Sequence, residues 1–140
     1  MNKLFAIVYV STMTHNMSIG EIEYLLERAR ERNKEHQVTG LLLCYKGTFM
    51  QYIEGPDADL NFIYDIIKAD NNHHNIIQIV HTAISAREFS DWSMAYSVAS
   101  KKQIDALTQQ SWLESDERKS TGRALLSEFW KVNALGRSIR

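Results

Sequence analysis

Three polar side chains stand on segments whose neighbouring inward positions are apolar. Tyr9 alternates with apolar residues in the run Leu4–Val10, and Gln51 does so in the run Thr48–Glu54. Asn33 lies one turn beyond the apolar stripe of a helical segment. A buried amide without a partner costs about 1–3 kcal/mol, so these side chains either satisfy backbone groups and one another or converge on a ligand. An apolar pocket with convergent amide and phenol groups suits a flat heteroaromatic ligand.

Other familiar chemistry is missing from the sequence. Trp92 and Met94 fall on one face of the last strand-like run, but neither common glycine-rich phosphate loop is present. The adjacent His73 and His74 are unsuited to a shared metal ion, and Cys44, inside an apolar run, is predicted to pack in the core. No pair of carboxylates stands out as acid and base. We therefore predict neither a metal site nor a catalytic site.

Five strands and two helices must position these side chains. The strands are predicted from apolar or alternating runs, and the helices from a capping-box spacing at Ser18 and Glu21 and from Pro56 at a helix start. The predicted elements are strands at Leu4–Val10, Val38–Tyr45, Thr48–Glu54, Ile76–Ile84 and Trp92–Val98, and helices over residues 18–36 and 56–69. This β-α-β-β-α-β-β order predicts an α+β, ferredoxin-like sandwich with both helices on one face of a mostly antiparallel sheet.

The last forty residues or so form a different kind of segment. Two amphipathic stretches, at about Lys102–Leu113 and Ser120–Leu135, predict two additional C-terminal helices. Both faces of the first strand are apolar, so these helices or a partner subunit are expected to cover the second face of the sheet. We therefore divide the chain into a domain at residues 1–100 and a helical cap at residues 101–140.

Length and composition argue against several classes of protein. The chain has 140 residues, 16 Lys and Arg against 17 Asp and Glu, and a net charge of −1, which disfavours nucleic acid as a partner. No apolar run approaches the length of a membrane span, and no signal sequence precedes the first strand. The single cysteine allows no internal disulfide. We therefore expect a cytoplasmic protein that binds neither nucleic acid nor membrane.

Several short motifs occur together in a distinctive order. They are Tyr9-Val10-Ser11, ARERN at residues 29–33, VTGLL at 38–42, FMQYIEG at 49–55 and DWSM at 91–94. In order and spacing they resemble the BLUF domain, a family of blue-light sensors that bind FAD. The resemblance covers about residues 3–98, and the C-terminal helical pattern is similar to the caps of short, stand-alone members of the family.

The resemblance implies roles for individual residues. Tyr9 corresponds to the photoactive tyrosine, Gln51 to the glutamine between that tyrosine and the flavin ring, and Asn33 to the asparagine that hydrogen-bonds the pyrimidine edge of the flavin. Trp92 and Met94 correspond to the pair on the last strand whose placement is linked to signalling. The apolar walls around the flavin ring are expected from Leu25, Ala29, Ile66 and Ile67.

One position departs from the family pattern. The family usually carries Arg-His after the second helix, near the ribityl and phosphate end of the flavin, whereas this chain has Asn72-His73. His73 retains the family residue, but Asn72 removes the bidentate phosphate contact that an Arg supplies. Arg32 either contributes to phosphate binding or is an exposed helix charge. The predicted cofactor is FAD, with FMN as the alternative.

The function that the resemblance implies is that of a blue-light photoreceptor and not of an enzyme. In the implied mechanism, flavin excitation drives reversible electron and proton transfer with Tyr9, and the hydrogen bonds of Gln51 rearrange. The signal is expected to pass to a separate effector protein or through a homo-oligomer. Two alternatives stay open, a cofactor-free ferredoxin-like interaction module and a flavoenzyme.

Overall fold

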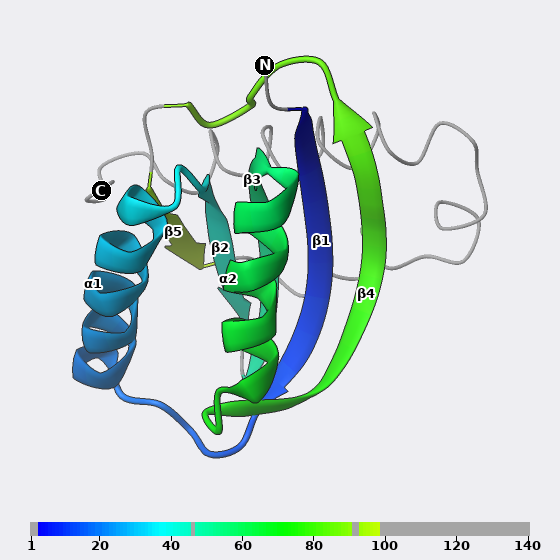
Figure 1. Cartoon of the computed structure of the whole chain (residues 1–140). Coiled ribbons are helices and arrows are strands. Elements are labelled where there is room, and N and C mark those ends of the chain that lie inside the picture. The colour runs from blue at the N-terminus through cyan, green and yellow to red at the C-terminus, as the bar shows by residue number, and fades with distance from the viewer. Residues whose placement is uncertain (1–2, 46, 91–92, 99–140) are drawn as a thin grey trace.

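A computed structural model describes residues 3–45, 47–90 and 93–98. Its elements are β1 (Leu4–Met13), α1 (Ile19–Glu35), β2 (Thr39–Tyr45), β3 (Thr48–Pro56), α2 (Asp57–Ala69), β4 (His73–Ile84) and β5 (Ala95–Val98). The strand order is β4-β1-β3-β2-β5, with antiparallel pairing throughout except that β5 runs parallel to β2. Both helices lie on one face of the sheet (Figure 1). The predicted ferredoxin-like architecture is thereby confirmed.

The first helix begins and ends as its sequence predicts. Ser18 caps α1 through the backbone N–H of Glu21, and the Glu21 carboxylate accepts the backbone N–H of Ser18 in return. At the other end, Gln37 adopts a positive φ of 59°, and the backbone N–H of Val38 donates to the carbonyl of Asn33 at 2.9 Å. This reversal satisfies a terminal carbonyl and turns the chain directly into β2.

The second helix is held by its apolar stripe. Pro56 is its N-cap residue, and Asp57 and Asp59 in the first turn favour the positive end of the helix dipole. Leu60 and Ile63 are fully buried against the sheet, each contributing about 1.5–3 kcal/mol by leaving water. Neither described helix has the length and apolar character needed to cross a membrane.

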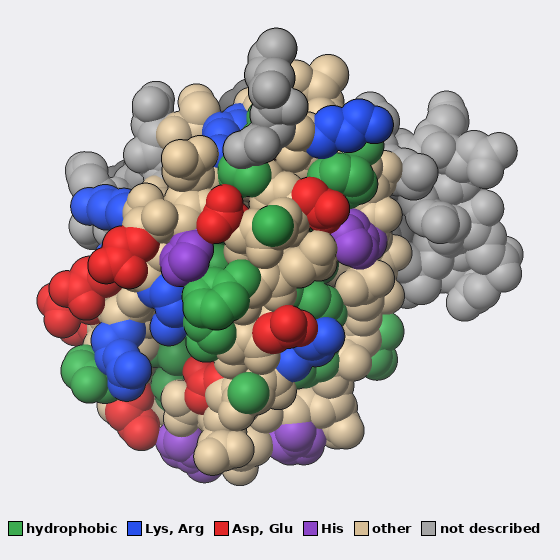
Figure 2. Space-filling view, viewed as in Figure 1, with side chains coloured by type: hydrophobic (Ala, Val, Ile, Leu, Met, Phe, Trp, Pro, Cys, Tyr) green, Lys and Arg blue, Asp and Glu red, His purple; other side chains and the backbone are tan. Residues whose placement is uncertain are grey.

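Both faces of the sheet are buried, as the alternation of β1 predicts. Ile7 and Tyr9 point toward the helices and belong to the core beneath them, whereas Ala6 and Val8 are buried on the opposite face. Cys44 packs in the core on the helix side. On the outer surface of the helices, charges of both signs are interspersed (Figure 2).

Three strand boundaries differ from the prediction by three residues, and the start of β2 and the end of β3 differ by one and two. β1 continues to Met13 and β4 begins at His73, because the polar ends of these strands pair with each other. β5 begins at Ala95 and not at position 92, because the carbonyl of Met94 accepts a hydrogen bond from Arg30 Nε at 2.8 Å in place of a strand partner. Trp92 and the predicted helical cap at residues 101–140 lie outside the described residues.

Candidate functional site

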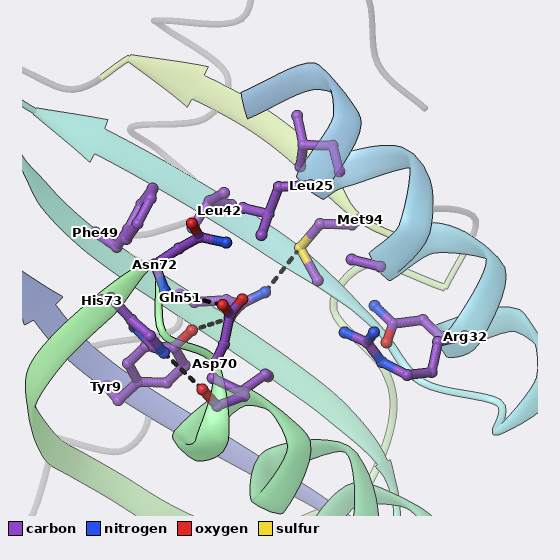
Figure 3. A pocket seen from close by; sticks show the side chains of 14 residues that line it. Tyr9, Leu25, Arg32, Leu42, Phe49, Gln51, Asp70, Asn72, His73 and Met94 are labelled. Carbon is purple, nitrogen blue, oxygen red and sulfur yellow. Dashed lines mark hydrogen bonds between the residues drawn. The ribbon is translucent and has the colours of Figure 1, made fainter. Parts of the chain in front are cut away.

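A pocket lies between α1 and α2, with the sheet as its floor (Figure 3). Its enclosed part measures about 50 Å³ and continues into an outer groove of about 550 Å³ between the two helices. The enclosed part is lined by Tyr9, Leu25, Leu26, Ala29, Arg32, Asn33, Leu42, Phe49, Gln51, Ile67, Asp70, Asn72, His73 and Met94. Apolar walls with a few inward polar groups are the usual make-up of a small-molecule site.

A chain of hydrogen bonds crosses the floor of the pocket. Tyr9 on β1 and Gln51 on β3 are register partners, so both side chains point to the helix face of the sheet. The Tyr9 hydroxyl donates to Gln51 Oε1, and Gln51 Nε2 donates to Met94 Sδ at 3.2 Å. All three side chains are buried. The amide therefore accepts at one end and donates at the other, which couples β1 to the segment that precedes β5.

The Tyr9 phenol is kept protonated by its surroundings. Burial raises its pKa well above the ordinary tyrosine value, and the charges of Tyr64 and Asp70 raise it further. The Tyr64 ring lies 5.7 Å from the Tyr9 ring, centroid to centroid. Because the phenol is protonated and donates one hydrogen bond, to Gln51 Oε1, it is a proton donor toward that atom alone.

Asn33 is placed on the opposite wall and is only partly satisfied. Its Nδ2 donates to the carbonyl of Ser93 at 2.8 Å, one residue before the Met94 carbonyl that Arg30 holds. Its Oδ1 is buried and has no hydrogen-bond partner among the described residues. An unpaired buried acceptor costs about 1–3 kcal/mol in the protein alone, so this oxygen is suited to a ligand that carries a donor.

His73 has both ring nitrogens engaged by the protein. Nε2 lies 2.6 Å from the carbonyl oxygen of Ile67, so it carries the proton and donates. Nδ1 lies 2.7 Å from Ser11 Oγ and accepts from it. The histidine therefore anchors the start of β4 to α2 and β1. His73 therefore lines the pocket with a ring whose two nitrogens are both already hydrogen-bonded to the protein.

The structure brings most of the predicted residues together. Tyr9, Leu25, Ala29, Arg32, Asn33, Gln51, Ile67, His73 and Met94 all line the enclosed part of the pocket. Ile66 lines the outer groove, and Trp92 lies outside the described residues.

Four further lining residues were not singled out from the sequence. Phe49 stands two residues before Gln51 on β3, and Leu42 is the register partner of Gln51 on β2, so strand alternation could have found both. Leu26 is part of the apolar stripe of α1. Asp70 carries no such signal, because its placement depends on where α2 ends.

A ferredoxin-like sheet with a pocket between its two helices defines a small-ligand-binding domain. The sequence model of the BLUF family, described as sensors of blue-light using FAD, matches residues 4–95. The chain belongs to this family. No described helix or strand outside that range contributes to the pocket.

Individual relatives agree with the family assignment. The blue light- and temperature-regulated antirepressor BluF of Escherichia coli strain K12 is 32% identical over 91 residues, which cover 65% of this chain and 23% of that protein. The photoactivated adenylate cyclase subunit beta of Euglena longa is 36% identical over 89 residues, covering 61% of this chain and 10% of that protein. The chain thus spans less than a quarter of the length of these curated relatives.

A solved structure matches almost the whole chain. The dark-state structure of the BLUF protein BlrB is 27% identical, with a TM-score of 0.73 over 91% of this chain and 98% of that one. A photo-activated structure of BlsA, at 20% identity and a TM-score of 0.73, supports the fold.

Proposed function

We propose that this chain is a blue-light photoreceptor in which Tyr9 and Gln51 form the switch beside a bound flavin. The observation that carries the proposal is the buried chain from Tyr9 through Gln51 to Met94, in the pocket of a protein that belongs to the BLUF family. The photoreceptor role follows from the family, and the residue roles are our inference from the contacts.

The residues present fit the ring of a flavin. Asn33 Oδ1 is a buried acceptor without a partner, and the pyrimidine part of the flavin ring carries an N–H donor. Leu25, Ala29 and Ile67 supply apolar walls for the flat ring. When bound, the flavin supplies absorption of blue light and an excited state that is a strong oxidant toward a neighbouring phenol.

Tyr9 and Gln51 carry out the switching step. Tyr9 is within hydrogen-bond contact of one amide oxygen, so its phenolic proton can move only toward Gln51. Rotation or tautomerisation of the Gln51 amide then changes whether a hydrogen-bond donor or an acceptor faces Tyr9 and Met94. Rotation presents Oε1 to Met94 Sδ, and because a thioether has no hydrogen to donate, the contact to Met94 is lost. The electron that Tyr9 would give to the excited flavin and the proton that it would give to Gln51 would both return to Tyr9, so no net reaction would occur.

The altered contact acts on the segment just before β5. Ser93 and Met94 present consecutive carbonyls to Asn33 and Arg30 on α1, and Met94 Sδ contacts Gln51 on the sheet. This short segment is therefore held between two layers by a few directed bonds, which makes it a two-state element that a local change can bias. We propose that it passes the signal to a separate effector protein.

The test is an absorption spectrum of the purified protein before and after blue illumination. We expect a yellow protein whose flavin bands shift to the red in the light and recover in the dark. Gln51→Leu should still bind flavin but show no light-induced shift, because no amide is left to exchange donor and acceptor. The matched control is Gln78→Leu, the same replacement at an exposed position of β4, which should shift as the wild type does.

Three outcomes would contradict the proposal. A normal red shift in Gln51→Leu would remove the amide from the switch. A colourless protein from flavin-replete cells would favour the cofactor-free interaction module. Steady-state bleaching of bound flavin by an added nicotinamide would instead favour a flavoenzyme.

A further inference from the structure

Arg32 stands where the enclosed pocket opens into the outer groove, and its side chain lines both spaces. Its Nε atom is buried and has no hydrogen-bond partner among the described residues. The side chain projects from α1 toward the space that Asp70 and Asn72 border from the α2 side (Figure 3). Burial and the charge of Arg28 lower the pKa of Arg32, and Asp70 opposes them only in part. The positive charge of Arg32 is therefore only partly balanced by negative charge in the protein, and such a guanidinium is suited to bind an anionic ligand.

Arg28 adds a second guanidinium to the same groove. It stands one helical turn before Arg32 on α1, so both side chains emerge on one face of the helix. The Arg28 guanidinium carbon lies 5.7 Å from the centre of the Tyr24 ring. Within the part of the chain that the structure describes, no ion pair joins either guanidinium to a carboxylate.

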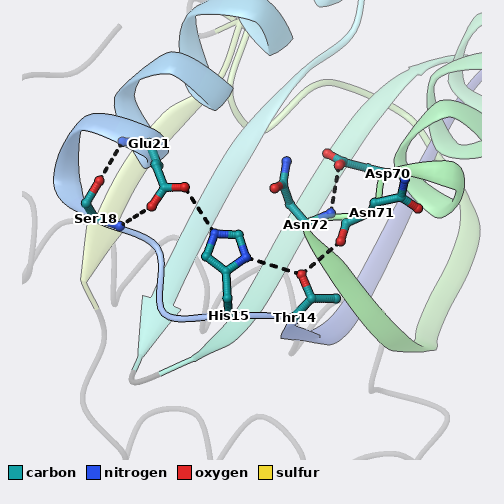
Figure 4. A network of polar contacts seen from close by, with 7 residues as sticks. All are labelled: Thr14, His15, Ser18, Glu21, Asp70, Asn71 and Asn72. Atoms are coloured by element: carbon teal, nitrogen blue, oxygen red, sulfur yellow. Dashed lines mark hydrogen bonds and ion pairs between the residues drawn. The ribbon is translucent and has the colours of Figure 1, made fainter.

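The two acidic residues of the groove are engaged elsewhere (Figure 4). Glu21 accepts the backbone N–H of Ser18 through Oε1 at 2.9 Å and contacts His15 Nε2 through Oε2 at 3.1 Å. Asp70 Oδ1 accepts the backbone N–H of Asn72 at 2.9 Å. These contacts direct both carboxylates to partners other than the two arginines. The groove therefore keeps two cations available beside the mouth of the flavin pocket.

We propose that Arg32 and Arg28 form the site for the phosphate of the flavin nucleotide, so that this chain holds the phosphate from α1. The inference rests on the proposed function and adds the ligand chemistry of the outer groove. The connection between α2 and β4, residues 70–72, contains no Lys or Arg that could supply such a cation. A guanidinium forms two parallel hydrogen bonds to a phosphate group. The groove places two guanidinium groups beside the pocket proposed for the ring, where they would hold the phosphate.

The test compares riboflavin, which has no phosphate, with FMN, which has one. Dissociation constants are measured by flavin fluorescence on the full chain freed of flavin. Wild type should bind FMN at least about tenfold more tightly than riboflavin, since charged hydrogen bonds contribute about 1.5–3 kcal/mol. Arg32→Gln should weaken FMN binding about tenfold more than it weakens riboflavin binding, because Arg32 also lines the ring pocket. Lys34→Gln removes one positive charge from the same helix outside the outer groove, and should change neither.

The possible results distinguish failure of the phosphate site from failure of the flavin site. Equal weakening of FMN and riboflavin by Arg32→Gln, or equal affinity of wild type for both, would overturn the phosphate site while leaving the flavin site intact. If Arg32→Gln does not fold, the exposed Arg28→Gln replaces it, with a smaller but still FMN-selective loss expected. Absence of any flavin binding by wild type would instead count against the proposed function.

Discussion

Two polar side chains on β3, three residues apart, are buried on opposite faces of the sheet. They differ in how fully the protein satisfies their hydrogen-bonding groups. Glu54 is fully buried on the face away from the helices, and its carboxyl oxygens accept four hydrogen bonds. Gln51, on the helix face, keeps one bond to Tyr9 and one weak bond to a sulfur atom. The buried acceptor of Asn33 nearby has none among the described residues.

The bonds to Glu54 hold the connection between β4 and β5 in place. Oε1 accepts from the Tyr52 hydroxyl at 3.0 Å and the Glu88 backbone N–H at 2.8 Å. Oε2 accepts from the Thr39 hydroxyl and the Phe89 backbone N–H, each at 2.8 Å. One carboxylate thus satisfies two backbone N–H groups and two hydroxyls.

The difference shows how one sheet separates stability from switching. The connection from β4 to β5 is fixed on one side by the saturated Glu54 and meets Gln51, through Met94, on the other. Any other position of the Glu54 carboxylate would break several hydrogen bonds. Rotation of the Gln51 amide breaks only a weak bond to the Met94 thioether on that side, so it costs little free energy. The movable end of the segment is therefore the end near the ligand.

The largest effect that this comparison predicts is that of Glu54→Ala. The variant leaves two backbone N–H groups and two hydroxyls without their acceptor, and we expect a loss of about 4 kcal/mol in the free energy of unfolding. Urea unfolding followed by circular dichroism measures it. Glu88→Ala, which keeps the backbone N–H and changes only an exposed side chain, should stay within about 0.5 kcal/mol of wild type. A loss below about 1 kcal/mol in Glu54→Ala would end the distinction between the two faces.

Thr39→Val is a smaller change that sharpens the same point. The Thr39 hydroxyl donates to Glu54 and accepts from Arg87 Nη1 at 2.9 Å. Valine preserves the shape but breaks both bonds, while three donors to Glu54 and the Arg87 bond to the Gln37 carbonyl remain. We expect a loss of about 2 kcal/mol and an unchanged light-induced shift, because no atom of the pocket moves. A lost or reduced shift would show that the two faces are coupled.

Much of this arrangement could be predicted from sequence, whereas features set by long-range hydrogen bonds could not. Alternation placed Tyr9 and Gln51 on one face, and the capping box fixed the start of α1, because these signals are local. The fourfold role of Glu54 depends on backbone groups 34 and 35 positions away, as the hydrogen bonds to Glu88 and Phe89 show. No local pattern reports such bonds.

The predicted start of the last strand was wrong for the same reason. Its sequence pattern predicts a strand from position 92, but side chains of α1 take the carbonyls of Ser93 and Met94. Hydrogen bonds from a distant helix therefore override the local strand propensity. Contacts distant in sequence therefore set the start of β5, which local patterns do not report.

Tyr9→Phe has the smallest expected effect on stability, and the size of this effect depends on pH. At pH 7 the variant loses one hydrogen bond, so its free energy of unfolding should be about 1 kcal/mol lower. Burial raises the pKa of Tyr9 in the folded protein, so above about pH 10 the unfolded chain releases this proton and the folded protein keeps it. Wild type then loses up to about 1.4 kcal/mol per pH unit through Tyr9, and the variant does not. Urea unfolding of both flavin-free proteins at pH 7 and pH 11 should therefore show the difference between them shrinking to near zero. A constant difference would mean that Tyr9 ionises as easily in the fold as in water, and Gln51 would then face no buried proton donor.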